Sequence, residues 1–462
     1  MHLEFFGATQ EVTGSCYLLS VGDKRILVEC GLIQGSHVHE RHNRDDFPFA
    51  PRDIDAVVLT HAHLDHSGRL PLLIKRGFKG PVYTHRATSD LCAIMLEDAG
   101  YLNEKDAQWE NRKRERKGLK PVEPLYSRNE AREAHKYFEP LEYGETREIV
   151  TGVEVTLRDA GHILGSAIAV LELHEGGVKR KVVFSGDLGH KGAPILRDPE
   201  LVRHADLVVM ESTYGNRRHR GWQETWQEMG EVLSNARSEK GNVLIPAFTV
   251  GRTQELLYEF KRHYDEWGIG DWEVFLDSPM GIKATNVYAQ HARIYDTRAT
   301  ELLQASGDVF GLPNLHMSER SEDSMKINRV QSGAIIIAGS GMCTGGRIKH
   351  HLKHNIWRQN AHLMIVGFQA RGTLGRALVD GAKRIRLWGE SILVRATVHT
   401  IGGLSAHADQ QGLMDWYQGF ENRPRVALVH GEPEAMEVLA YRLQSECRAD
   451  VLQAEFRQKV IL

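Results

Sequence analysis

The stretch "LTHAHLDHSGRL", residues 59–70, places three histidines and one aspartate within six positions, directly after an apolar run. His61 and His63 alternate, so both point the same way in an extended or tightly turned segment, and Asp65 and His66 follow as a helical pattern begins. Two pairs of metal-binding side chains therefore face two neighbouring points. Imidazole combined with carboxylate suits zinc better than magnesium, whose sites prefer oxygen ligands. Solvated histidines are the alternative, but burying these four groups without a metal leaves costly unpaired polar atoms.

The length and composition indicate a multidomain cytoplasmic protein. A chain of 462 residues is too long for one ordinary core, so we expect two or three domains. With 58 Lys and Arg against 61 Asp and Glu, any site for a polyanion must be a local patch. The five cysteines are odd in number and lack CxxC spacing, which argues against a disulfide framework and a zinc ribbon. No apolar run approaches the roughly 20 residues of a membrane span, and the start does not resemble a signal peptide. We therefore predict a cytoplasmic protein with no membrane contact.

Short apolar runs repeatedly lead into loops of Gly, Ser, His or Asp and then into helical patterns. Such strands followed by helices predict a layered α/β architecture. The runs are "RILVECG" (25–31), "DAVVLTH" (55–61), "KVVFSGD" (181–187), "DLVVMES" (206–212), "NVLIPAF" (242–248), "GAIIIAGSG" (333–341), "HLMIVGF" (362–368) and "VALVHGE" (426–432). The polar stretch 97–133, which contains "RKRERK", is predicted to be an excursion from the first domain.

Three more candidate metal ligands stand at predicted strand ends. His162 lies in "RDAGHILGSA", Asp187 in "VFSGDLG" and His430 in "LVHGEP". One such residue at a strand end is more often structural than functional, so their joint pattern carries the inference.

Six segments together carry a family resemblance. In order and separation, "THAHLDHSG", "DAGHILGSA", "FSGDLG", "ESTYGNR", "LSAHAD" and "LVHGE" resemble the metallo-β-lactamase superfamily. More narrowly they resemble its β-CASP nuclease branch, which includes the pre-mRNA 3′-end cleavage endonuclease and its bacterial and archaeal relatives. The resemblance covers essentially the whole chain. It implies an αββα metallo-β-lactamase sandwich with an inserted α/β β-CASP domain.

The resemblance implies a division of the ligands between two metal ions. His61, His63 and His162 hold one ion, Asp65, His66 and His430 hold the other, and Asp187 bridges them. The expected ions are two Zn²⁺, with Mn²⁺ or Fe²⁺ possible under other supply conditions. Glu29 in "LVECG" stands where the family usually has Asp, which orients a ligand histidine from behind.

The middle of the chain favours a nucleic-acid substrate. About 180 residues separate "ESTYGNR" from "LSAHAD", enough for a whole α/β domain. We predict a first metallo-β-lactamase part over 1–210, the β-CASP insert over 211–394 and a C-terminal metallo-β-lactamase part over 395–462. Glu211 and His407 match the acid and histidine motifs at the two ends of the insert. A histidine at the position of His430 goes with RNA-processing members of the family, so single-stranded RNA is the expected partner. Monomer and homodimer both stay open.

Phosphate contacts are predicted at glycine-rich and basic positions. "GSGMCTGGR" (339–347) follows an apolar run and precedes a predicted helix, so its backbone N–H groups are able to hold a phosphate. The predicted RNA-binding residues are Ser340, Gly341, Thr344, Gly345, Gly346, Arg347, Lys349, Arg252 and Ser405.

The expected activity is metal-assisted hydrolysis of RNA phosphodiester bonds, with Asp187, His407 and Glu211 as catalytic residues. His407, supported by Glu211, is predicted to protonate the leaving 3′ oxygen. "SAHAD" favours endonuclease over 5′-exonuclease action, although both stay open. The alternatives are a small-molecule hydrolase of the lactamase or glyoxalase type, which leaves the insert unexplained, and a DNA nuclease, which His430 disfavours. A catalytically inactive RNA-binding subunit is disfavoured because every metal ligand of the family pattern is present in the sequence.

Overall fold

The apolar runs of the sequence form three large sheets and one two-stranded sheet in a computed structural model, which describes residues 1–35 and 37–462. The chain divides into two units. The first contains Met1–Lys191, Arg197–Arg218 and His407–Leu462, and the second contains Gly192–Leu196 and His219–Ala406. Among the described residues, no helix is both long and apolar enough to cross a membrane.

The first unit is built on two seven-stranded sheets. One has the order β22-β1-β2-β3-β4-β5-β6, and its strands are β1 (His2–Phe5), β2 (Tyr17–Val21), β3 (Lys24–Val28), β4 (Ala56–Val58), β5 (Val82–His85), β6 (Phe138–Leu141) and β22 (Lys459–Ile461). The other has the order β21-β20-β11-β10-β9-β8-β7, and its strands are β7 (Thr146–Val150), β8 (Val153–Asp159), β9 (Ala167–Glu175), β10 (Val178–Phe184), β11 (Leu207–Glu211), β20 (Arg425–Val429) and β21 (Val451–Gln453).

The two sheets pack face to face over one apolar core. In β8, burial alternates along the strand, so that Val153, Val155 and Leu157 face inward. They meet Leu19 and Val28 of the first sheet in a single cluster of buried side chains. Each fully buried aliphatic or aromatic side chain contributes about 1.5–3 kcal/mol, so this core holds the two sheets together.

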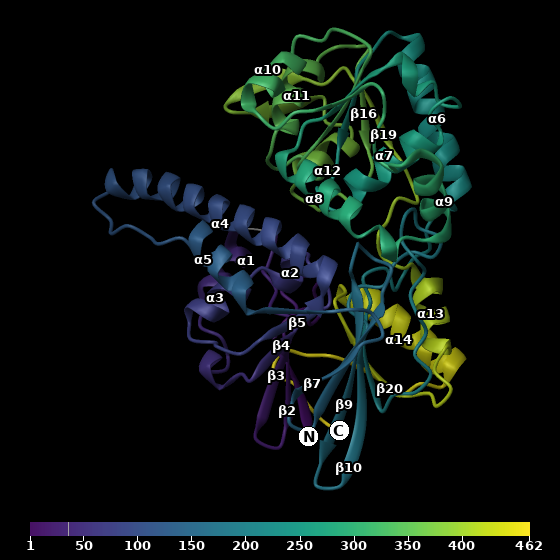
Figure 1. The fold of residues 1–462 in the computed structure, drawn as a ribbon. Helices are drawn as coiled ribbons and strands as arrows, with labels where there is room; N and C mark the ends of the chain where they lie inside the picture. Colours follow the sequence, from purple (N-terminus) through teal and green to yellow (C-terminus); the bar gives the residue numbers. More distant parts are fainter. Residues whose placement is uncertain (36) are drawn as a thin grey trace. The chain divides into compact units, whose positions relative to one another are not determined.

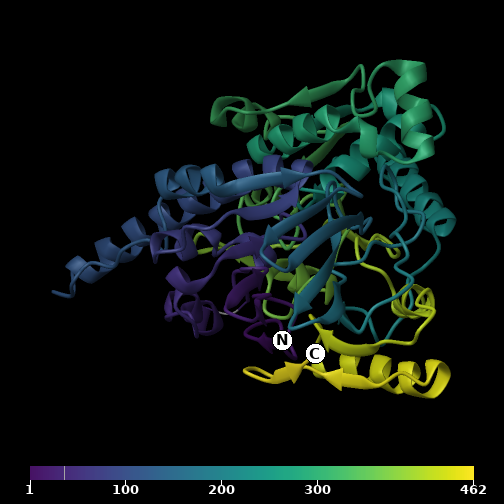
Figure 2. The same cartoon turned by 60° about the horizontal axis from the view of Figure 1, so that its bottom comes forward.

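Helices cover the outer faces of the sandwich (Figure 1). Those on the side of the second sheet, α13 (Gln410–Gln418) and α14 (Pro433–Cys447), join its outward-facing side chains in a second core. The helices of the N-terminal part are α1 (His37–Glu40), α2 (Leu64–Ser67), α3 (Leu70–Lys75), α4 (Arg86–Glu115) and α5 (Arg128–Ala134), with single 3-10 turns at Arg41–Arg44, Pro51–Asp53 and His135–Tyr137. The antiparallel pairing of β1 with β22 brings the two termini side by side (Figures 1 and 2).

The second unit is a parallel α/β layer. Its six-stranded sheet has the order β14-β13-β15-β12-β16-β19, and β17 pairs with β18 in the small sheet. The strands are β12 (Val243–Pro246), β13 (Glu273–Leu276), β14 (Leu315–Met317), β15 (Ala334–Ala338), β16 (His362–Ile365), β17 (Arg384–Leu387), β18 (Glu390–Leu393) and β19 (Thr397–Thr400). The helices are α6 (Trp222–Ser238), α7 (Arg252–Arg262), α8 (Pro279–Gln290), α9 (Thr297–Ser306), α10 (Ser321–Ile327), α11 (Ile348–Asn355) and α12 (Leu374–Val379), with 3-10 turns at Ile269–Asp271 and Ala292–Ile294.

The predicted fold class is confirmed. The sandwich of two sheets between helices and the separate α/β unit are the architecture that the resemblance implied. The helix expected after "THAHLDH" is divided in two, because α2 ends at Ser67 and α3 begins at Leu70. Asp65 and His66 consequently lie in the short helix α2, directly beside the loop that holds His61 and His63.

Candidate metal centre

The candidate ligands gather where parallel strands end. In the first sheet, β3 and β4 run parallel, and His61 follows the end of β4. In the second sheet β10, β11 and β20 run parallel, and Asp187 and His430 follow β10 and β20. The carboxyl ends of parallel strands meet at one edge, where ligand sites of α/β folds are commonly built. His162 reaches the same place from the turn between β8 and β9.

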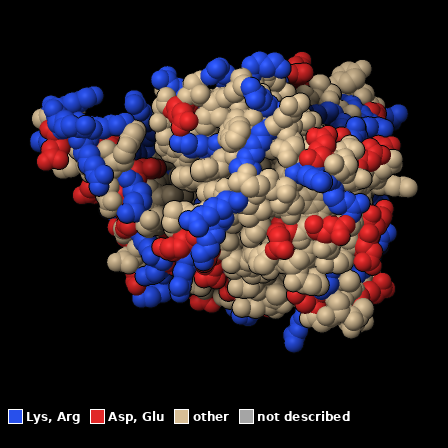
Figure 3. Space-filling view, turned by 90° about the horizontal axis from the view of Figure 1, so that it is seen from above, with Lys and Arg blue, Asp and Glu red and all other residues tan. Residues whose placement is uncertain are grey.

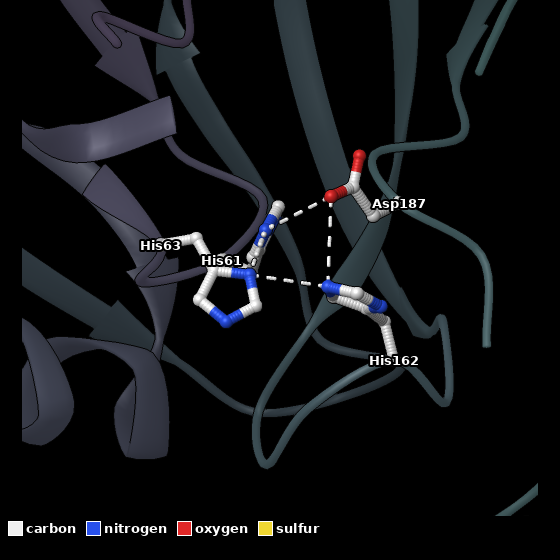
Figure 4. A group of neighbouring side chains, drawn as sticks. All are labelled: His61, His63, His162 and Asp187. Carbon is white, nitrogen blue, oxygen red and sulfur yellow. Dashed lines mark hydrogen bonds and ion pairs between the residues drawn. The ribbon is translucent and has the colours of Figure 1, made fainter. Parts of the chain in front are cut away.

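The first ligand group contains His61, His63, His162 and Asp187 (Figure 4). The Nδ1 atom of His63 lies 3.2 Å from Nε2 of His61 and 3.1 Å from Nε2 of His162. The Oδ2 atom of Asp187 lies 3.3 Å from Nε2 of His61 and 3.5 Å from Nε2 of His162. All four donor atoms lie within 4.8 Å of one another.

The second ligand group contains Asp65, His66 and His430. The Nε2 atoms of His66 and His430 are 3.3 Å apart, and Nε2 of His430 lies 3.4 Å from Oδ2 of Asp65. The other carboxylate oxygen of Asp187, Oδ1, lies 3.3 Å from Nε2 of His66. Asp187 thus presents one oxygen to each group.

Both groups fit a metal ion. Bonds of about 2.0–2.2 Å to tetrahedral zinc separate neighbouring ligand atoms by about 3.4 Å, which matches the spacing of the first group. Apart from its ion-pair contacts with His66 and His430, the buried Oδ1 atom of Asp187 has no hydrogen-bond partner among the described residues, and burying such an acceptor is costly unless a cation satisfies it. The cluster therefore suggests a dinuclear metal site, and Asp187 contacts both groups.

Electrostatics also favours cations at this edge. Burial lowers the pKa values of His61, His63 and His162, that of His63 to about 3, which keeps these imidazoles in their neutral, metal-binding form. Burial also lowers the pKa of His66, but the carboxylates of Asp187 and Glu29 outweigh it and hold that pKa well above its usual value. The carboxylates around His66 therefore favour a positive charge, which a proton or a metal ion supplies.

Three side chains behind the ligands fix the orientation of their rings. Glu29, the predicted orienting residue, lies with Oε2 2.8 Å from Nδ1 of His66, and its Oε1 accepts a hydrogen bond from the backbone N–H of Thr60. The hydroxyl of Thr60 lies 3.1 Å from Nδ1 of His61. The hydroxyl of Thr213 lies 3.1 Å from Nδ1 of His430. In each ring the Nδ1 contact turns Nε2 toward the metal groups, an arrangement that also strengthens ligand basicity.

Sequence reasoning missed Thr60 and Thr213. The available signal was their position, since Thr60 directly precedes "HAH" and Thr213 stands in "ESTYG". Two backbone conformations were also unforeseen. Glu29 and His430 have φ values of 66° and 50°, which side-chain-bearing residues rarely adopt, so the surrounding fold must hold them.

Glu211 and His407 form a pair beside the first ligand group. Nδ1 of His407 lies 3.2 Å from Oε1 of Glu211, which also accepts a 2.7 Å hydrogen bond from the backbone N–H of Leu188. The His407 ring lies 4.5 Å from the ring of His162, centre to centre. Burial lowers the pKa of His407, but Glu211 and Asp187 more than offset it and raise it to about 9. The His407 side chain is 21% exposed, so it is reachable from solvent.

The predicted RNA-binding residues lie in the second unit. Ser340, Gly341, Thr344, Gly345 and Gly346 form the loop between β15 and α11, in which the hydroxyl of Ser340 accepts a hydrogen bond from the Gly345 N–H. Thr344 and Gly346 are exposed there. Ser405 is half-buried just before the chain returns to the first unit. Phosphate binding by these residues stays a prediction.

The contacts of the basic residues argue for structural roles. The Arg347 guanidinium donates to Asp277 and to two backbone carbonyls, at 2.7–2.8 Å. Arg252 is buried and pairs with Glu255 one turn along α7. Lys349 lies over the ring of Trp388. The two arginines thus have partners inside the unit, which argues against direct phosphate contacts by either of them.

The fold and the site together define a metallo-hydrolase scaffold, an αββα sandwich with paired histidine and carboxylate ligand groups at one strand edge. Three family models match the chain: the metallo-beta-lactamase superfamily over residues 9–228, the Beta-Casp domain over 253–378, and the Zn-dependent metallo-hydrolase RNA specificity domain over 391–452. The chain belongs to the β-CASP family of the metallo-β-lactamase superfamily.

Known proteins resemble the chain over nearly its whole length. Ribonuclease TTHA0252 of Thermus thermophilus is 40% identical over 440 residues, which cover 95% of each chain. Transcription termination factor FttA of Methanocaldococcus jannaschii is 32% identical over 443 residues, which cover 94% of this chain and 67% of that protein. A solved structure of a protein of unknown function from Enterococcus faecalis shares the fold, with a TM-score of 0.56, 14% identity and coverage of 100% and 99%.

Proposed function

We propose that this chain is a metal-dependent ribonuclease that hydrolyses the phosphodiester bonds of RNA. The observation that carries the proposal is the pair of ligand groups joined by Asp187, in a chain that matches the model of a metallo-hydrolase RNA specificity domain. A relative named as a ribonuclease, 40% identical over 95% of both chains, supports RNA rather than a lactam or thioester as the substrate.

Zinc is the proposed metal at both positions. Five histidines and two carboxylates supply the donor atoms, a set that suits zinc and other nitrogen-binding transition metals more than magnesium or calcium. Manganese and iron are the alternatives. When bound, two such cations would bring the pKa of a water molecule toward neutrality and would offset negative charge on the phosphate.

Three residues of the chain have separate proposed roles in catalysis. Asp187 is proposed to link the two ligand groups, since each of its carboxylate oxygens faces one of them. His407 is the proposed general acid, which gives a proton from Nε2 to the leaving 3′ oxygen. Glu211 contacts Nδ1, the opposite ring nitrogen, and so favours the protonated imidazole and fixes its orientation. The products then carry 5′-phosphate and 3′-hydroxyl ends.

We further propose single-stranded RNA as the substrate and endonucleolytic cleavage as the main mode. The histidine at position 430 and the "LSAHAD" segment support these choices through the family resemblance. Five free cysteines, four of them buried, support a reducing, cytoplasmic location.

The test uses purified protein of measured metal content and RNA labelled at either end. RNAs with 5′-triphosphate, 5′-monophosphate or 5′-hydroxyl ends are compared with the matching DNA and with lactam and thioester substrates. We expect internal RNA cleavage that is indifferent to the 5′ group. Hydrolysis of a lactam or thioester with intact RNA would refute the function, and release of mononucleotides only from 5′-monophosphate RNA would refute the endonucleolytic mode.

Asp187→Ala tests the site itself. We expect loss of both bound metal and activity, because the shared ligand of both groups is removed. Metal analysis that finds two ions in this variant would contradict the role of Asp187.

A further inference from the structure

Helix α4 extends well beyond the sandwich of the first unit (Figure 1). Its first half is buried along one side, but after Gly100 its only buried residue is Ala107. The last fifteen residues, 101–115, make about 22 Å of helix at 1.5 Å per residue. The chain then returns along the helix, and the Asn111 side chain bonds both the N–H and the carbonyl of Val122, at 2.7 and 2.9 Å. We call residues 101–122 the arm.

The end of the arm carries a concentrated positive charge. The segment 112–120, "RKRERKGLK", contains six Lys and Arg and one Glu, so its formal charge is +5 in a chain of −3. Figure 3 shows Lys and Arg side chains gathered on this projecting end, at the left of the view. Arg114 lies 3.8 Å from Glu110. Within 1–35 and 37–462, Arg112, Arg116 and Lys117 have no carboxylate at ion-pair distance, so this charge is available to a ligand.

Aromatic side chains alternate with the cations on one face of the arm. Tyr101, Lys105, Trp109 and Lys113 follow one another at four-residue intervals, which places them on the same side of the helix. Trp109 is 60% exposed and Tyr101 42% exposed, although aromatic side chains of this size are usually largely buried. The ammonium groups of Lys113 and Lys105 lie 3.0 and 5.3 Å from the centres of the Trp109 and Tyr101 rings. Exposed aromatics beside cations are the combination that binds single-stranded nucleic acid, by base stacking and by phosphate neutralisation.

The base of the same helix adjoins the metal centre. The N-cap of α4 is His85, the last residue of β5, which runs parallel to β4 in the edge that bears the ligands. The hydroxyl of Thr88 donates a 2.7 Å hydrogen bond to the carbonyl of Gly165, in the turn that carries His162. From Thr88 to Arg112 the helix rises about 36 Å, a span of on the order of ten stacked nucleotides.

We propose that the arm is a second RNA-binding surface, which holds the substrate backbone at Arg112, Arg116 and Lys117 and stacks a base on Trp109 while another part of the same strand occupies the metal centre. The inference rests on the proposed ribonuclease function for its choice of polyanion. It implies that affinity rises with RNA length once the strand is long enough to reach the end of the arm.

The test compares two triple variants that remove equal charge. Arg112→Gln/Arg116→Gln/Lys117→Gln alters the arm, and Gln keeps helix propensity. The control, Arg52→Gln/Lys136→Gln/Lys179→Gln, removes three exposed cations elsewhere in the first unit. Binding of a labelled 24-nucleotide RNA is measured by fluorescence anisotropy, with His407→Ala added to every protein to slow cleavage while the metals are retained.

At 0.1 M salt we expect the arm variant to bind the 24-mer about tenfold to 100-fold more weakly than the control. The slope of log Kd against log salt should fall by about 2, because each phosphate neutralised on a single strand contributes about 0.7. Trp109→Ala should weaken binding about fivefold or more, and Trp109→Phe should restore most of it, since stacking needs only an aromatic face. Circular dichroism confirms that α4 remains helical in each variant.

Activity gives a second measurement, in proteins that retain His407. The ratio of kcat/KM for the 24-mer to kcat/KM for a 6-mer should fall in the arm variant and stay unchanged in the control. Equal affinity of the arm and control variants for the 24-mer would overturn the proposal. It would favour an acidic protein as the partner of the arm instead. Failure of the unaltered protein to cleave any RNA would instead refute the proposed function, while the anisotropy comparison would still decide whether the arm binds RNA.

Discussion

At the scale of single residues, the candidate metal centre depends on which ring nitrogen of each histidine faces the other candidate ligands. His61, His66 and His430 direct Nε2 to the metal groups because Thr60, Glu29 and Thr213 occupy Nδ1. A motif of histidines identifies candidate ligands, but the partner on the opposite ring nitrogen decides whether each lone pair is correctly placed.

His407→Ala should reduce turnover by about 10² to 10⁴, the usual effect of losing a general acid, with both metals retained. Metal content and single-turnover cleavage of end-labelled RNA are measured on the same preparation. His204→Ala is the matched control, because His204 is an exposed histidine that lies 3.2 Å from Glu421 and outside the ligand groups. Full activity of His407→Ala would remove His407 from the mechanism.

Thr213→Val should weaken metal binding at the second ligand group by about tenfold to 100-fold, because the hydroxyl that orients His430 is lost. Competition with a chromogenic zinc chelator measures the affinity. Thr84→Val controls for the loss of a buried hydroxyl, since the Thr84 hydroxyl donates its hydrogen bond to the Leu59 carbonyl. Unchanged affinity in Thr213→Val would show that the ring of His430 is held by its backbone alone.

At the scale of elements, strand ends were the predictable part of the site. His61, Asp187 and His430 follow apolar runs that form parallel strands, and Glu211 ends another, so the sequence indicated both the fold class and the place where the candidate ligands meet. The partners of charged side chains were not predictable in the same way. Arg347 pairs with Asp277, seventy positions earlier, and no local pattern distinguishes such a pair from a phosphate site.

The domain bounds at 211 and 395 stay a prediction. Glu211, the first residue of the predicted insert, is the last residue of β11 in the first compact unit. Apolar runs mark where strands lie, but the point at which the chain leaves one unit depends on packing that no single segment encodes. The sequence predicted only that residues 97–133 leave the first domain as a polar excursion. It did not predict the long exposed end of α4, since helical propensity alone does not tell whether a helix has a neighbour to pack against.

Asp277 joins three elements of the second unit and should make its stability depend on pH. This buried carboxylate directly follows β13 and contacts His351 and Arg347 on and beside α11, and Ser324 on α10. Burial raises its pKa, but His351, Ser324 and Arg347 outweigh this and lower it below the usual value. A carboxyl group with a lowered pKa in the folded state stabilises the fold above its unfolded pKa, and this stability is lost as pH falls through the folded value.

Asp277→Asn should therefore reduce the free energy of unfolding at pH 7 by about 3–5 kcal/mol, because His351 and Arg347 lose a buried charged partner. Between about pH 5 and pH 2, the variant should lose less further stability than the unaltered protein. Urea unfolding followed by tryptophan fluorescence reports on the second unit, since all tryptophans except Trp109 and Trp416 lie there. If the free energies of unfolding of the two proteins changed with pH in parallel, Asp277 would not be the source of the pH dependence.

At the scale of the whole molecule, metal binding should stabilise the first unit but not the second. Every candidate ligand belongs to the first unit, so removing metal should lower the unfolding temperature of that unit and leave the second unchanged. Ligand at 1,000 times its Kd stabilises a fold by about 4 kcal/mol, which is readily measured. Calorimetry before and after chelation, with zinc added back as the control, tests this expectation. Equal shifts of both transitions would show that the units unfold together.

The chain crosses into and out of the second unit at neighbouring points of the first. The backbone N–H of Gln410 donates to the Arg217 carbonyl at 3.0 Å, and the Gln410 side chain donates to the Gly215 carbonyl at 2.7 Å. A short bridge from 218 to 407 would therefore excise residues 219–406 without cutting a strand of either large sheet of the sandwich. Replacement of residues 219–406 by another insert at this point would leave every candidate metal ligand in the chain, although Gly192–Leu196 would lose the rest of the second unit.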